Sequence, residues 1–131
     1  MLQAGQSVAL PDGRIIEPSQ VTGPTRSGRV IAYCTDTAPC PAVVENSQDA
    51  DLLIHDGTFT AEFEEQARIS GHSTAGQAAQ VALDAGCHRL ALTHISARFD
   101  DDKPLLDEAM AIFPETFVAR DLMEVRVPAR K

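Results

Sequence analysis

The sequence predicts an α/β fold in which parallel strands alternate with helices. Three short runs are apolar on both faces, as buried strands are, and they cover residues 28–34, 51–56 and 89–94. Helix-forming segments separate these runs, and such alternation implies parallel pairing through right-handed crossovers. The 131 residues are enough for one hydrophobic core, so we expect a single domain over residues 1–131.

Turn-forming residues define the N-terminal elements. Ser7–Leu10 and Ile15–Ile16 flank the Asp12–Gly13 turn, a pattern typical of a β-hairpin. Glu17–Gly28 is rich in turn formers and predicts a surface loop. The apolar run Gly28–Cys34 then provides the first buried strand.

Three helices are expected from proline placement and amphipathic patterns. Pro41 favours the first turn of a short helix within residues 41–50. Thr60–Ser70 predicts a polar helix, and residues 104–113 predict another helix after the third buried strand. Two closing strands are expected, at residues 116–120 and 123–127.

An alanine-rich helix gives the clearest signal in the sequence. Ser73 is its expected N-cap, and Gly86 stands where a helix commonly ends. Between them the apolar residues follow helical spacing, at Ala75, Ala78, Ala79, Ala82 and Leu83.

Composition narrows the function classes. Eleven Lys and Arg against nineteen Asp and Glu leave a formal charge of −8, which argues against a self-sufficient nucleic-acid binder. Three cysteines cannot all pair and match no zinc-finger spacing, so reduced thiols are expected. No signal peptide or membrane-spanning run is present in the sequence, so a cytoplasmic protein without a membrane partner is expected.

Polar residues follow each of the three buried strands. Asp36 comes after the first, His55 and Asp56 close the second, and His94 closes the third. The carboxyl ends of parallel strands share one rim of a sheet, where ligands bind. Singly, each residue is more often a turn, cap or core residue than a ligand. Together, their carboxylate and imidazole groups suit Zn²⁺.

A fourth polar group stands at the start of the alanine-rich helix. His72, Ser73 and Thr74 lie where the free N–H groups of a helix attract anions. A histidine just before an N-cap is nevertheless more often a plain loop residue. His55, inside an apolar strand, is expected in the core or behind the site, and His88 is expected at the surface.

Four ordered motifs carry a resemblance to a known family. YCTDTAPC, LLIHDGTF, SGHSTAGQAA and LTHISARF follow one another as in the ribonuclease Z family, the tRNA 3′-end endonucleases of the metallo-β-lactamase superfamily. The resemblance covers essentially the whole chain. It implies the C-terminal half of an αββα sandwich, with a mixed sheet and helices on one face.

The resemblance also implies roles for individual residues. Asp36 resembles the carboxylate that bridges two zinc ions, and His94 resembles a terminal ligand of one of them. His72 resembles a catalytic histidine that helps protonate the leaving 3′ oxygen, oriented by Asp56. Asp56 replaces the usual Glu, and its shorter side chain is expected to lie further from His72. Substrate-binding roles are implied for Ser73, Thr74, Ser96 and Arg98.

Other family motifs do not occur in these 131 residues. The H-x-H-x-D-H segment, which supplies most metal ligands and the general base, has no match. The resemblance therefore implies a chain that is inactive alone and cleaves precursor tRNA only with a complementary N-terminal half. The alternatives are a non-catalytic remnant that self-associates as a homodimer, and a superfamily hydrolase acting on small phosphodiesters.

Overall fold

The computed structural model describes residues 1–23 and 28–129. These residues fall into two compact units, one within Met1–Gly28 and the other over Arg29–Ala129. The single domain predicted over residues 1–131 stays a prediction. Among the helices in the described ranges, none is long and apolar enough to cross a membrane.

The first unit is built around the predicted hairpin. Strand β1 (Val8–Ala9) pairs antiparallel with β2 (Ile15–Ile16), which confirms the prediction. Gly13 has a φ of 87°, a backbone conformation that favours glycine in the connecting turn. The short helix η1 (Leu2–Ala4) precedes β1.

The loop predicted over Glu17–Gly28 is wrong in its first part. Residues Pro18–Val21 form a single helical turn, α1, because Pro18 occupies its first position and Glu17 and Gln20 cap each other's backbone. Residues 24–27 of that predicted loop lie outside the described residues.

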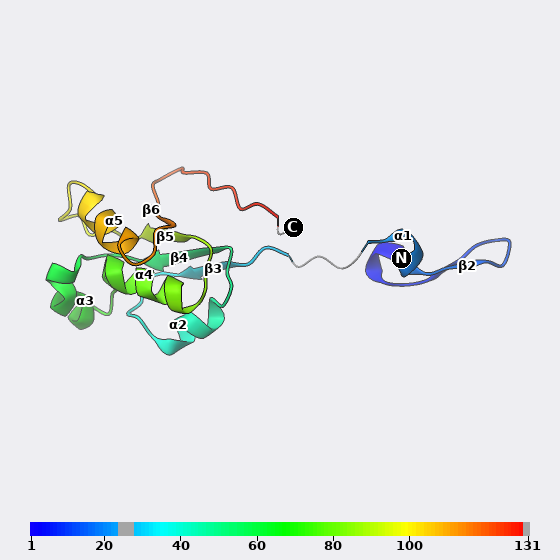
Figure 1. Cartoon of the computed structure of the whole chain (residues 1–131), viewed down its shortest axis with the longest axis horizontal. Coiled ribbons are helices and arrows are strands. Elements are labelled where there is room, and N and C mark those ends of the chain that lie inside the picture. The colour runs from blue at the N-terminus through cyan, green and yellow to red at the C-terminus, as the bar shows by residue number, and fades with distance from the viewer. Residues whose placement is uncertain (24–27, 130–131) are drawn as a thin grey trace. The chain divides into compact units, whose positions relative to one another are not determined.

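The second unit contains a four-stranded parallel sheet (Figure 1). Its order is β3-β4-β5-β6, and every neighbouring pair is parallel. The strands are β3 (Ile31–Cys34), β4 (Leu52–Asp56), β5 (Leu90–Thr93) and β6 (Thr116–Val118). The α/β class is confirmed. The antiparallel pairing expected of a mixed sheet occurs, among the described residues, in the separate β1–β2 hairpin.

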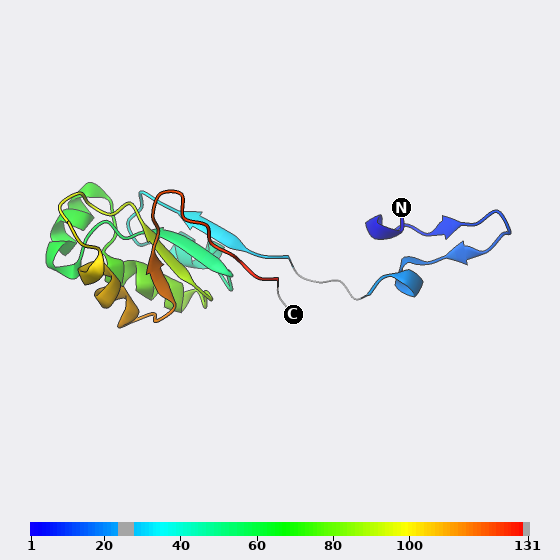
Figure 2. The ribbon, with the colours of Figure 1, turned by 90° about the horizontal axis from the view of Figure 1, so that it is seen from above.

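Helices cover one face of this sheet (Figures 1 and 2). They are α2 (Pro41–Asn46), α4 (Ala75–Asp84) and α5 (Lys103–Met110), with η2 (Ala61–Phe63) and α3 (Glu64–Ser70) before α4. The alanines of α4 pack on Leu53, Leu90 and Leu92, which are fully buried. Small alanine side chains let a helix lie close to the sheet. Helices on one face are therefore confirmed.

Helix α4 begins one residue later than the sequence predicts. Thr74, not Ser73, is the N-cap, and its side chain accepts a hydrogen bond from the Gln77 backbone while Gln77 bonds back. Gly86 follows the helix with a φ of 65°, as predicted for the residue after the C-cap.

The C-terminal segment lies over the opposite face of the sheet from the helices (Figure 2). Met123, Val125 and Val127 line a cavity of about 280 Å³ together with Ile31 and Phe117. The strand predicted at residues 123–127 is wrong: the segment forms no strand, and its apolar side chains lie against this face of the sheet. Part of this face stays open, since Ile31 is 54% and Tyr33 71% exposed.

His55 is buried within the sheet as a core residue. It is 0% exposed, its Nδ1 lies 2.8 Å from the Asp56 carbonyl oxygen, and its Nε2 has no partner among the described residues. Burial lowers the pKa of His55 because the charged imidazolium loses hydration, although the nearby Asp56 partly opposes this.

This burial predicts a loss of stability in mild acid. Unfolding releases His55 to its ordinary pKa of 6.5, so below that pH the unfolded chain takes up more protons than the folded one. The free energy of unfolding should fall by at most about 1.4 kcal/mol per pH unit for one such group. Urea titrations at about pH 7.5 and about pH 5.5 measure the slope of the free energy of unfolding against pH. This slope should be smaller in His55→Gln than in the wild type. Equal slopes in wild type and His55→Gln would contradict the assignment.

Candidate metal and hydrolytic site

The carboxyl edge of the parallel sheet brings the predicted residues together. Asp36 follows β3, Asp56 ends β4, and His94 follows β5. Asp36 and His94 have φ values of 53° and 58°, in the left-handed region that residues other than glycine rarely adopt. Two such residues, at the ends of the strands on either side of β4, mark a place where local backbone strain is tolerated, as is common at functional sites.

Asp56 is the buried centre of the site. Its side chain is 0% exposed, and its Oδ2 lies 2.7 Å from His72 Nδ1 and accepts a hydrogen bond from the Thr37 backbone N–H. Its Oδ1 accepts from both the backbone N–H and the hydroxyl of Thr58. The expectation that the shorter Asp would lie further from His72 is wrong, because the loop before α4 brings His72 into direct contact.

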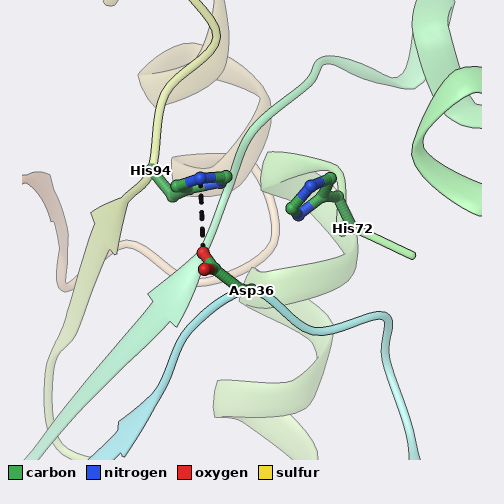
Figure 3. Close-up of side chains that lie close together, drawn as sticks. All are labelled: Asp36, His72 and His94. Atoms are coloured by element: carbon green, nitrogen blue, oxygen red, sulfur yellow. Dashed lines mark ion pairs between the residues drawn. The ribbon is translucent and has the colours of Figure 1, made fainter. Parts of the chain in front are cut away.

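Three side chains offer donor atoms to a metal ion (Figure 3). One atom from each of Asp36, His72 and His94 lies within 4.8 Å of the others. His94 Nε2 is 3.3 Å from Asp36 Oδ1. Two ligand atoms that each lie about 2.1 Å from a tetrahedral ion are separated by about 3.4 Å. Asp36 and His94 therefore fit a metal ion in both chemistry and spacing, and His72 adds a third donor atom within 4.8 Å.

Both histidines are also oriented for such a role. His72 Nδ1 is engaged by Asp56 and His94 Nδ1 lies 2.9 Å from Thr58 Oγ1, which leaves each Nε2 for another partner. The side chain of His72 is 22% exposed and that of His94 45%. A metal-bound histidine typically engages its second nitrogen in this way.

The start of α4 does not provide the free N–H groups expected for anion binding. The four N–H groups of residues 74–77 are bonded to Gln77, Phe59, Glu108 and Thr74 respectively. That expectation is wrong because the Glu108 carboxylate from α5 already occupies the helix start. Ser73 is 0% exposed and donates its hydroxyl to the Thr37 carbonyl at 2.7 Å. Both Ser73 and Thr74 therefore have structural partners, and their substrate-binding role stays a prediction.

Arg98 presents a cation beside the site. Its guanidinium lies 5.0 Å from the ring centre of Phe59 and 4.5 Å from that of Phe63. Phe59 in turn packs edge-on against His72. Within the described ranges Arg98 takes part in no ion pair, so its charge is available to an anion. Ser96 lies in the same loop, and its backbone N–H donates to the Thr58 carbonyl at 3.1 Å.

Sequence reasoning missed Thr58. Its hydroxyl stands between Asp56 and His94, and its backbone N–H bonds the Asp56 side chain two residues earlier. An Asp that bonds the N–H two residues on forms a recognised turn, so the Asp56–Thr58 spacing was the available signal. The remaining histidine outside the core, His88, is exposed as expected.

The fold and the site define a class of protein. A family model described as a beta-lactamase superfamily domain matches residues 16–95, and the chain belongs to that family. The metallo-β-lactamase fold protein YhfI from Bacillus subtilis is similar in structure, with a TM-score of 0.65 and 26% identity. That match covers 88% of this chain and 44% of YhfI.

Within this class the chain is similar to ribonuclease Z. It is 49% identical to the ribonuclease Z of Methanosarcina acetivorans over 98% of this chain and 42% of that protein. It is 48% identical to the ribonuclease Z of a Nostoc species, again over 42% of that protein. Human tRNase Z, short form, is similar in structure with a TM-score of 0.58 and 28% identity, over 87% of this chain and 37% of that one. The chain thus spans less than half the length of these relatives.

Proposed function

We propose that this chain supplies part of the active site of a metal-dependent phosphodiesterase that cleaves precursor tRNA at its 3′ end. The observation that carries the proposal is the convergence of Asp36, His72 and His94, whose donor atoms lie within 4.8 Å at the carboxyl edge of the sheet. The names of the relatives support the choice of substrate. The cleavage itself is a hydrolysis of a phosphodiester.

Asp36 and His94 are the proposed metal ligands, and zinc is the proposed ion. Asp36 has the more exposed side chain, at 67%, and is suited to bridge two ions. Bound metal would supply a water of lowered pKa and stabilise charge on the phosphate oxygens. Asp36 and His94 hold their donor atoms on one side of the site, opposite the loop that carries His72 (Figure 3).

His72 and Asp56 form the proposed acid pair. Asp56 holds the His72 ring by its Nδ1, so Nε2 is the atom that would take up a proton and then pass it to the leaving 3′ oxygen. Arg98 and Ser96 are proposed to bind phosphate oxygens beside them. The aromatic rings under Arg98 restrict its guanidinium to this side of the site.

The chain alone offers too few ligands for a tightly bound metal pair. A structural zinc site has four protein ligands and a catalytic one has three with a water. We therefore propose that the remaining ligands come from a segment that corresponds to the part of the relatives that this chain does not match, since the relatives are more than twice as long as this chain.

A complementation experiment tests the proposal. The chain is mixed with the part of the Methanosarcina acetivorans relative that it does not match, and zinc binding and cleavage of a precursor tRNA are measured. We expect weak, substoichiometric zinc binding and no cleavage by the chain alone. The mixture should bind zinc tightly and cleave precursor tRNA. A tight two-zinc site in the lone chain, seen by calorimetry, would contradict the ligand assignment. A mixture that binds zinc but leaves precursor tRNA intact would contradict the assignment of precursor tRNA as the substrate.

Small phosphodiesters are the second candidate substrate class. YhfI, a metallo-β-lactamase fold protein, is similar to this chain with a higher TM-score than human tRNase Z. The formal charge of −8 also gives this chain little attraction for a polyanion. Faster cleavage of bis(p-nitrophenyl) phosphate than of precursor tRNA in the same mixture would favour this class.

A further inference from the structure

One hydroxyl group links the buried carboxylate to the exposed histidine. Thr58 is 5% exposed, and its Oγ1 donates a hydrogen bond to Asp56 Oδ1. The same Oγ1 lies 2.9 Å from His94 Nδ1. His94 Nδ1 is itself 4.0 Å from Asp56 Oδ1, too far for a direct hydrogen bond. The Thr58 hydroxyl therefore connects Asp56 to His94.

The number of protons fixes the direction of this chain of hydrogen bonds. An ionised carboxylate only accepts, and a threonine hydroxyl has one proton to donate. Because Thr58 donates that proton to Asp56, its Oγ1 can only accept from His94. A neutral His94 must then carry its proton on Nδ1, so its Nε2 carries a lone pair and no proton.

That lone pair faces a second acceptor. His94 Nε2 lies 3.3 Å from Asp36 Oδ1, and a neutral His94 ring with its proton on Nδ1 has none left to bridge them. Two acceptors at this distance are satisfied by a shared cation. On the other side of the site, Asp56 Oδ2 engages His72 Nδ1 directly at 2.7 Å, which leaves His72 Nε2 unprotonated by the same reasoning.

We propose that Thr58 is a positioning residue through which Asp56 fixes the tautomer of His94, while Asp56 fixes that of His72 directly. One buried carboxylate thereby holds both rings with Nδ1 protonated and Nε2 free. The use of the two free nitrogens for a metal ion or a phosphate rests on the proposed function. The assignment of the two tautomers rests on the hydrogen bonds alone and not on the proposed function.

The experiment measures the imidazole nitrogen shifts of the metal-free full chain by NMR, which report which nitrogen is protonated. Both rings should be Nδ1-protonated in the wild type. Thr58→Val, which keeps the side-chain shape and removes the hydroxyl, should shift His94 toward the other tautomer and leave His72 unchanged. Thr58→Ser should restore the wild-type pattern. Thr116→Val is the matched control, because Thr116 is 8% exposed and donates its hydroxyl to the Phe113 carbonyl at the far end of the sheet.

Metal affinity in the complemented mixture gives a second readout. Loss of a group that supports a metal ligand typically costs about 10- to 100-fold in affinity. We expect a loss of that size in Thr58→Val and none in Thr58→Ser or Thr116→Val. If the wild-type tautomers are as inferred but the mixture neither binds metal nor cleaves a phosphodiester, the proposed function fails and the positioning role stands. An Nε2-protonated His94 in the wild type, or an unchanged His94 in a folded Thr58→Val, would overturn the inference.

Discussion

Replacing Asp36 with alanine is expected to abolish metal binding in the complemented mixture. Asp36 offers the carboxylate nearest to His94, and its removal takes away a direct ligand and the proposed bridge between two ions. The loss of affinity should exceed the roughly 100-fold that follows from removing a supporting residue. Metal content after dialysis and a zinc titration are the measurements. Retention of wild-type metal content in Asp36→Ala would contradict its assignment.

His72→Ala is the companion variant, with a different expected result. If His72 acts on the leaving oxygen, turnover should fall by about 10²- to 10⁴-fold, the usual contribution of a general acid, with metal retained. His88→Ala, at an exposed residue beside the amino ends of β4 and β5, opposite the carboxyl edge that carries the site, should change neither quantity. Loss of metal in His72→Ala would instead make His72 a ligand, in keeping with the donor atoms within 4.8 Å.

The second large effect is expected in the oligomeric state, because the chain should form a homodimer. Ile31 and Tyr33 on the edge strand β3 are 54% and 71% exposed, on the sheet face opposite the helices. The C-terminal segment lies over this face and leaves those two side chains open. Contiguous apolar surface of this kind seldom persists on a soluble monomer. Two-fold pairing of identical faces would bury it in a sheet-on-sheet core.

Light scattering at micromolar concentration measures this directly. The wild type should have about twice the mass of the 14.1 kDa chain. Tyr33→Glu should shift it to a monomer, because pairing would bury the new charge. Ile69→Glu is the matched control, since Ile69 is 72% exposed on α3, and it should remain dimeric. A wild-type monomer would rule out this pairing.

The sequence by itself determined the order and type of most elements. Apolar runs placed β3, β4 and β5, and helical spacing placed α4, because these patterns follow from the backbone periods of strands and helices. The strand alternation also predicted that Asp36, Asp56 and His94 would share one rim. These features depend on local chemistry and on connection rules, both of which the sequence contains.

Only the tertiary structure decided how those side chains are linked. The loop before α4 brings His72 against Asp56, and Glu108 from α5 occupies the helix start that was expected to bind anions. Thr58, which resembles an ordinary turn residue in the sequence, connects Asp56 to His94. Residues 123–127 alternate like a strand but lie over a sheet face. Each of these outcomes depends on contacts between segments distant in the chain, and local pattern does not determine such contacts.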